Sequence, residues 1–118
     1  MSKKILVIDE DEDLLKVIFI TLKTQGFEVI PSRNFNVLST LESINPDLIL
    51  MDNVVNGVRA VEFCKNIKGN AAFSHIPIVL LSAINDLEEF ANECGANAYL
   101  AKPLDLFEVE TLVQELTQ

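Results

Sequence analysis

The chain has 118 residues, of which 49% are hydrophobic, and this predicts a single folded domain over residues 1–118 rather than a disordered segment. Its net charge of −9 disfavours nucleic acid and anionic membrane as direct partners, because both surfaces are themselves negatively charged. The apolar run near the N-terminus is too short for a signal peptide, and no segment is long enough to insert into a membrane. Cys64 and Cys94 lie at apolar positions of helical patterns, which favours buried thiols and a cytoplasmic location.

Short apolar runs alternate along the chain with segments of helical periodicity. The runs are rich in Ile, Leu and Val without polar alternation, which is typical of strands that are covered on both faces. The predicted strands are Ile5–Ile8, Phe27–Ile30, Leu48–Met51, Ile76–Leu81 and Ala98–Ala101. The apolar stripes of the predicted helices begin at Leu14, Val37, Val61, Leu87 and Val109. Strict alternation of this kind predicts an α/β fold, a parallel sheet with helices on both faces. We expect its flavodoxin-like doubly wound form, with five strands in the order 2-1-3-4-5 and five helices.

Chemically active side chains stand where the predicted strands end. Asp9 and Glu10 follow the first strand, Asp52 follows the third, Ser82 follows the fourth and Lys102 comes just past the fifth. The carboxyl ends of parallel strands share one edge of a sheet, and the first and third strands are neighbours in the order 2-1-3-4-5. We therefore expect the three acids to converge, with the serine and the lysine beside them.

Three carboxylates so close together cannot all stay ionised unless a cation joins them. A site of oxygen ligands with open water positions suits a hard ion, which in cells is Mg²⁺. The remaining acids of the same stretch, Asp11, Glu12 and Asp13, are interpreted as helix-start residues, because acidic groups there cap free N–H groups and favour the positive end of the helix dipole.

This constellation resembles the receiver domain of response regulators, the CheY-like family of two-component signalling, over essentially the whole chain. The resemblance implies that Asp52 is the phosphoacceptor and that Asp9 and Glu10 form the metal-binding acidic pair. It implies that the backbone carbonyl of Val54 completes the protein ligands of Mg²⁺, and that the Ser82 hydroxyl bonds the phosphoryl group.

The resemblance also assigns the end of the chain. Lys102 matches the family's active-site lysine, Tyr99 its aromatic switch residue, and Lys102–Pro103 its cis peptide bond. A phosphohistidine on a histidine kinase or histidine phosphotransfer protein would donate the phosphoryl group, and the face made of the fourth helix, fifth strand and fifth helix would shift in response. Such a protein is not an enzyme in the usual sense, since it catalyses only its own phosphorylation and dephosphorylation.

The loop after Asp52 departs from the family pattern. Asn56 stands where a proline is common, and Arg59–Ala60 stand where Asp-Gly is common. These changes predict a looser loop and an altered metal affinity or phosphoryl lifetime. They also leave an alternative open, a degenerate pseudo-receiver that works as a phosphate-insensitive interaction module. A flavin or nucleotide enzyme on the same fold is disfavoured, because the acids after the first strand would repel phosphate.

Two surface features suggest partners. Eight acids lie between Ala83 and Gln118 with Lys102 as the only base, which indicates either a downstream partner with a basic surface or simply a solvated acidic face. Val17 and Ile20 lie outside the core stripe of the first helix, and exposed apolar residues there predict docking of a helical phosphodonor protein.

Overall fold

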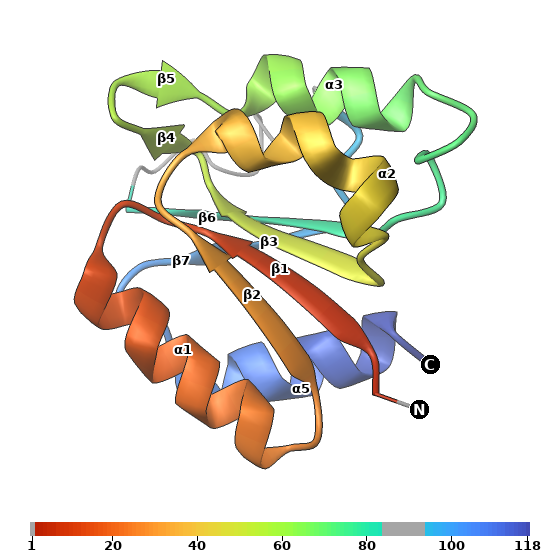
Figure 1. Cartoon of the computed structure of the whole chain (residues 1–118). Coiled ribbons are helices and arrows are strands. Elements are labelled where there is room, and N and C mark those ends of the chain that lie inside the picture. Colours follow the sequence, from red (N-terminus) through yellow and green to blue (C-terminus); the bar gives the residue numbers. More distant parts are fainter. Residues whose placement is uncertain (1, 84–93) are drawn as a thin grey trace.

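A five-stranded parallel sheet forms the centre of the molecule in the computed structural model, which describes residues 2–83 and 94–118 (Figure 1). The strands of this sheet are β1 (Lys4–Ile8), β2 (Glu28–Ser32), β3 (Leu48–Asp52), β6 (Ile78–Ser82) and β7 (Ala98–Ala101). They are arranged in the order β2-β1-β3-β6-β7, and every neighbouring pair is parallel. This is the predicted order 2-1-3-4-5, so the flavodoxin-like sheet is confirmed, with strand bounds that differ by up to two residues.

Helices cover both faces of this sheet. They are α1 (Glu12–Thr24), α2 (Leu41–Ile44), α3 (Val61–Lys68) and α5 (Leu106–Leu116), with a 3₁₀ helix, η1 (Phe35–Thr40), leading into α2. Figure 1 shows α1 and α5 on one face and α2 and α3 on the other. The predicted fourth helix, with its stripe from Leu87, lies almost entirely outside the described residues. In the part of the chain that the structure describes, no helix has the length and apolar character needed to cross a membrane.

The strand β1 shows why the predicted strands lack polar alternation. Leu6 and Ile8 pack into the core on the α2 and α3 side, whereas Ile5 and Val7 pack into the core on the α1 and α5 side. All four side chains are completely buried. Burying such a side chain contributes roughly 1.5–3 kcal/mol to folding stability, so apolar residues are favoured on both faces of the strand. The two cysteines are buried as expected, and the Cys64 thiol donates to the Cys94 carbonyl oxygen at 3.5 Å.

The second helical segment differs from the predicted continuous helix, since it winds as η1 and then as the single turn α2. Its polar side chains explain the change. The Asn34 side chain caps η1 by accepting from the Asn36 backbone N–H at 2.9 Å, and the Ser39 and Thr40 hydroxyls donate to backbone carbonyls three residues earlier. Such local bonds compete with the regular α-helical ladder.

The segment after β3 forms a small antiparallel hairpin, in which β4 (Val54–Val55) pairs with β5 (Val58–Arg59). Asn56 and Gly57 turn the chain with φ angles of 53° and 78°. Two central residues with positive φ are the conformation that an Asn-Gly pair favours, and proline is unable to adopt it. An ordered turn thus takes the place of the proline, and the looser loop stays a prediction.

Candidate functional site

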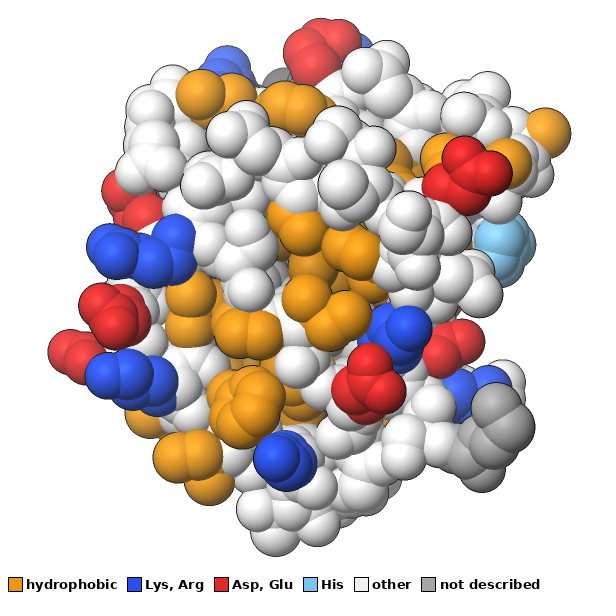
Figure 2. Space-filling view, in the orientation of Figure 1, with side chains coloured by type: hydrophobic (Ala, Val, Ile, Leu, Met, Phe, Trp, Pro, Cys, Tyr) orange, Lys and Arg blue, Asp and Glu red, His pale blue; other side chains and the backbone are white. Residues whose placement is uncertain are grey.

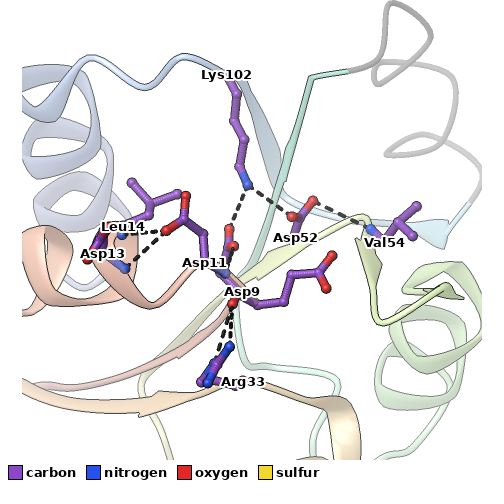
Figure 3. Close-up of polar contacts among 9 residues, drawn as sticks. Asp9, Asp11, Asp13, Leu14, Arg33, Asp52, Val54 and Lys102 are labelled. Atoms are coloured by element: carbon purple, nitrogen blue, oxygen red, sulfur yellow. Dashed lines mark hydrogen bonds and ion pairs between the residues drawn. The ribbon is translucent and has the colours of Figure 1, made fainter.

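The carboxyl edge of the sheet gathers four of the predicted site residues, and Figure 3 shows Asp9, Asp52 and Lys102 among them. Asp9 follows β1, Asp52 ends β3, Ser82 ends β6 and Lys102 follows β7. The register of the two central strands places Ile8 of β1 opposite Met51 of β3, and the residue that follows each of them is an aspartate. The prediction that distant residues meet at this edge holds for these four.

Lys102 joins the two aspartates. Its Nζ lies 2.7 Å from Asp9 Oδ2 and 2.9 Å from Asp52 Oδ2, and Figure 3 shows the lysine reaching between them. The side chains are largely buried, with exposed fractions of 1% for Asp9, 14% for Asp52 and 21% for Lys102. Charged hydrogen bonds in so dry a place are strong, because water competes little with them. The lysine is thus the cation that makes the proximity of the two carboxylates tolerable in this structure.

This environment shifts the pKa values of Asp52 and Lys102. Burial raises the pKa of Asp52 above its usual value, and the charge of Asp9 adds to this, although the Lys102 hydrogen bond acts in the opposite direction. Burial would lower the pKa of Lys102, but its hydrogen bonds to Asp9 and Asp52 outweigh that effect and raise the pKa. Lys102 therefore stays protonated at neutral pH, and any further positive charge beside Asp52 would favour its carboxylate form.

Glu10 occupies the exposed rim of this edge. Its backbone carbonyl accepts hydrogen bonds from Nε and Nη2 of Arg33, each at 3.3 Å. Across residues 2–83 and 94–118, no three Asp, Glu, His or Cys side chains are grouped so that they could hold a metal ion. The expected convergence of three acids is therefore realised for two of them, because Lys102 draws Asp9 and Asp52 together while Glu10 remains at the rim.

The other acids of the stretch begin α1 as predicted. Asp11 is the N-cap, and its side chain accepts from the backbone N–H groups of Asp13 and Leu14 at 3.0 and 3.2 Å. Asp9 Oδ1 accepts in turn from the backbone N–H of Asp11 at 2.9 Å. The capped helix start thus holds the Asp9 carboxylate, with its other oxygen turned to Lys102 (Figure 3).

The hairpin places Val54 beside Asp52. The Val54 backbone N–H donates to Asp52 Oδ1 at 3.5 Å, a long contact. Asn56 Nδ2 donates to the backbone carbonyl of Arg33 at 3.2 Å, so Arg33 contacts both the hairpin and the loop that carries Glu10. Sequence reasoning missed Arg33, since the end of the second strand seemed to carry no chemistry and a lone surface arginine gives no signal.

The two predicted switch residues lie at opposite levels of exposure. Ser82 is buried, with 4% of its surface exposed, whereas Tyr99 on β7 is 41% exposed. The Lys102 backbone N–H donates to the Ser82 carbonyl at 2.9 Å, and the Lys102–Pro103 bond is cis as expected. A further polar residue that sequence reasoning missed is Asn53, which follows Asp52 and is completely buried.

Comparison with known proteins gives a consistent result. The family model described as "Response regulator receiver domain" matches residues 5–114. The DNA-binding response regulator MtrA of Mycolicibacterium paratuberculosis is 30% identical over 106 residues, which are 87% of this chain and 46% of that protein. The phosphate regulon transcriptional regulatory protein PhoB of Escherichia coli is 29% identical, with the same coverage of each chain. The chain thus spans less than half the length of these curated relatives.

A solved structure agrees with them. A two-component response regulator from Clostridium difficile superimposes with a TM-score of 0.86 at 26% identity, covering 98% of this chain and 95% of that one. The likeness covers nearly the whole of both chains, and it supports the predicted fold class.

Proposed function

Because the chain belongs to the response regulator receiver family, we propose that it is a phosphorylatable switch in which Asp52 accepts a phosphoryl group from a phosphohistidine. The observation that carries this proposal is the buried Asp9–Lys102–Asp52 arrangement, in which one ammonium group contacts both aspartates. A merely structural ion pair would not need a second buried carboxylate beside the first. The whole chain, residues 1–118, would form one receiver domain.

The transfer itself asks little of the protein beyond position and charge. An Asp52 carboxylate oxygen attacks the phosphorus, the phosphorus–nitrogen bond of the donor breaks, and its electron pair returns to the imidazole nitrogen. Lys102 already lies 2.9 Å from Asp52 and would follow the developing negative charge on the phosphoryl oxygens. The hydroxyl of Ser82, one strand away, would donate to a phosphoryl oxygen of the product.

The donor set fits Mg²⁺. Asp9 and Asp52 supply carboxylate oxygens, Glu10 stands next to Asp9 at the rim, and the Val54 carbonyl belongs to the loop beside Asp52. A hard ion prefers oxygen ligands of this kind together with water. Mg²⁺ when bound would neutralise charge between the Asp52 carboxylate and the phosphoryl oxygens. Lys102 would then share Asp9 and Asp52 with the ion, which predicts a modest affinity.

The signal would leave through the side of the sheet at which β7 is the outermost strand. Movement of Ser82 toward Asp52 would vacate space for the exposed Tyr99 ring, and the face formed by the fourth helix, β7 and α5 would change. The expected fourth helix lies outside the described residues. On the α5 side this face carries the acids Asp105, Glu108, Glu110 and Glu115, which supports a downstream protein with a basic surface rather than direct contact with nucleic acid.

The phosphodonor would dock on α1. Val17 and Ile20 are 42% and 65% exposed, and a groove of ≈ 540 Å³ lies between α1 and β2, lined by Leu15, Phe19, Ile20 and Pro31 with Glu12 and Lys16 at its side. Figure 2 shows hydrophobic side chains gathered on this face, between basic and acidic groups. A helix of a histidine kinase or histidine phosphotransfer protein could lay its apolar side here. We infer a cytoplasmic location from the same partners.

The test uses beryllofluoride, which mimics a phosphoryl group on a carboxylate, together with Mg²⁺. Calorimetry should show saturable binding to the wild-type protein and none to Asp52→Ala. Glu62→Ala, which removes an exposed carboxylate on α3, is the matched control and should bind like the wild type. A small phosphodonor with Mg²⁺ should likewise add one phosphoryl group by mass to the wild-type protein only.

The pseudo-receiver is the second candidate, and one observation favours it. Lys102 already neutralises both buried aspartates, and the described residues contain no preformed group of three metal ligands. Such a site could be stable without any ion. If neither beryllofluoride nor a small phosphodonor modifies the wild-type protein at millimolar Mg²⁺, the phosphorylation switch is wrong and the interaction module stands.

A further inference from the structure

Asn53 is a polar residue in a place that calls for an apolar one. It directly follows Asp52 and is completely buried. Its backbone is fully used, because its N–H donates to the Leu81 carbonyl at 2.8 Å and its carbonyl accepts from the Ala60 N–H at 2.7 Å. Its side chain is different, since neither Nδ2 nor Oδ1 has a hydrogen-bond partner in the structure. A buried amide without partners costs stability and needs an explanation.

Strand alternation shows which way this side chain points. On β3, Ile49 and Met51 pack into the core on the α2 and α3 side, and Asn53 is the next residue with that parity. The ladder bond from Asn53 to β6 shows that the extended conformation continues this far. Successive side chains of a strand alternate between the two faces of a sheet, so the amide lies on the same face as Met51.

The register places Ser82 beside it. Asp52 is paired with Leu81 of β6, so one residue further along both strands Asn53 comes opposite Ser82. Ser82 has the parity of Leu80, which packs into the same core as Met51. The amide of Asn53 and the hydroxyl of Ser82 therefore project from neighbouring strands on one face of the sheet, next to Asp52.

We propose that Asn53 is a positioning residue for the switch, whose Nδ2–H group donates to Ser82 Oγ when a phosphoryl group is on Asp52. A serine hydroxyl can accept at its lone pairs while it donates its single hydrogen. A donor on the Oγ lone pair turns that hydrogen toward the phosphoryl oxygen. Asn53 lies opposite Ser82 in the register of β3 and β6 and directly follows Asp52, so this bond would form one residue away from the modified carboxylate.

This role explains why an unpartnered amide is kept. The cost of burying it falls on the unmodified state, and the new bond is gained only in the modified state. A differential interaction of this kind shifts a two-state equilibrium toward the modified conformation. The inference rests on the proposed function, because it requires a phosphoryl group on Asp52.

The experiment compares Asn53→Leu with the wild-type protein, using beryllofluoride and Mg²⁺ as the probe. Leucine has a similar volume and no polar atoms, so the melting temperature of the unliganded variant should rise. The beryllofluoride affinity measured by calorimetry should nevertheless fall about tenfold, since one charge-supported hydrogen-bond network is lost. A purely structural role would not move these two quantities in opposite directions. Asn53→Ala gives the same comparison of affinities should the leucine variant fold poorly.

A double-mutant cycle with Ser82→Ala identifies the partner. In the Ser82→Ala background, Asn53→Leu should cause no further loss of affinity, because the hydroxyl it positions is gone. An equal loss in both backgrounds overturns the inference, as does a leucine variant that binds beryllofluoride like the wild type. If the wild-type protein itself fails to bind, the proposed function is what fails, so the two failures are distinguishable.

Discussion

The loops that follow β1 and β3 each present one aspartate to Lys102, but they hold it in different ways. The first loop runs straight into α1, and both oxygens of Asp9 are bonded, one to the helix start and one to the lysine. The second loop folds into the hairpin, and Asp52 has the lysine and one long contact to Val54. A fully bonded carboxylate suits a fixed support, whereas a less satisfied one suits a group that is to be modified.

Removing the shared cation should affect both loops at once. Lys102→Met leaves two buried carboxylates without their counter-charge, so the free energy of unfolding should fall by about 3 kcal/mol. Urea denaturation measures the change. Lys16→Met, which removes an exposed lysine beside Glu12, is the control and should be nearly neutral. A loss of similar size in both variants would show that the buried triad is not special.

Replacing each aspartate alone should change the stability of the protein in opposite directions for the two loops. Asp9→Asn should destabilise the protein, because Asp9 is 1% exposed and accepts two hydrogen bonds. Asp52→Asn should stabilise it at neutral pH without Mg²⁺, because the raised pKa of Asp52 means that its charged form is disfavoured in the folded state. Thermal melts of both variants in chelator measure the difference.

The pH dependence of that second variant follows from the direction of the shift. A carboxyl whose pKa is higher in the folded state binds its proton more readily there, so its charge weakens the wild-type fold at high pH and ceases to do so as pH falls. The advantage of Asp52→Asn should therefore be largest at neutral pH and shrink on acidification. An advantage that grows toward acid would mean that Asp52 is stabilised as a carboxylate.

The contrast between the loops also marks what the sequence could predict. Long-range convergence of Asp9, Asp52 and Lys102 followed once the strand order 2-1-3-4-5 was assumed, because the carboxyl ends of parallel strands share one edge of the sheet. The helix-start role of Asp11 followed equally from local chemistry. Both inferences use backbone rules that hold wherever such residues occur.

What escaped prediction depends on details between side chains. The hairpin had a signal, since Asn56-Gly57 between valines is the usual sequence of a tight two-residue turn, but the family resemblance drew attention to the missing proline instead. No sequence signal pointed to the Arg33 contacts or to the unpartnered amide of Asn53, because these depend on which atoms the fold brings within hydrogen-bond distance. The same is true of the contacts that Lys102 makes with both aspartates.

A substitution in the turn of the hairpin should have a smaller effect on stability. Gly57→Ala places a β-carbon at a φ of 78°, where nothing lies within 4 Å, so the cost is that of the left-handed backbone alone, about 1 kcal/mol. Hydrogen exchange should then speed up in the backbone amides of residues 54–59 and stay unchanged in α1. Equal protection of the hairpin in both proteins would mean that contacts with Arg33, rather than the turn, hold it in place.

The smallest effect concerns Arg33, which connects the two loops. Its guanidinium contacts the Glu10 carbonyl, but its side chain is 61% exposed, so its loss should scarcely change stability.

The effect on Mg²⁺ binding distinguishes two roles of Arg33. If its hydrogen bonds hold the loop that carries Glu10 in place, Arg33→Met should weaken Mg²⁺ binding a few-fold, about 0.5–1 kcal/mol. If Arg33 acts only through its positive charge, it repels the ion, and Arg33→Met should bind Mg²⁺ more tightly than the wild-type protein. Lys16→Met, which also removes a cation paired with Glu12 but makes no contact with Glu10, fixes the size of the charge effect in a calorimetric titration. A gain in affinity for both variants would show that the loops act separately, whereas a loss confined to Arg33→Met would show that they are joined.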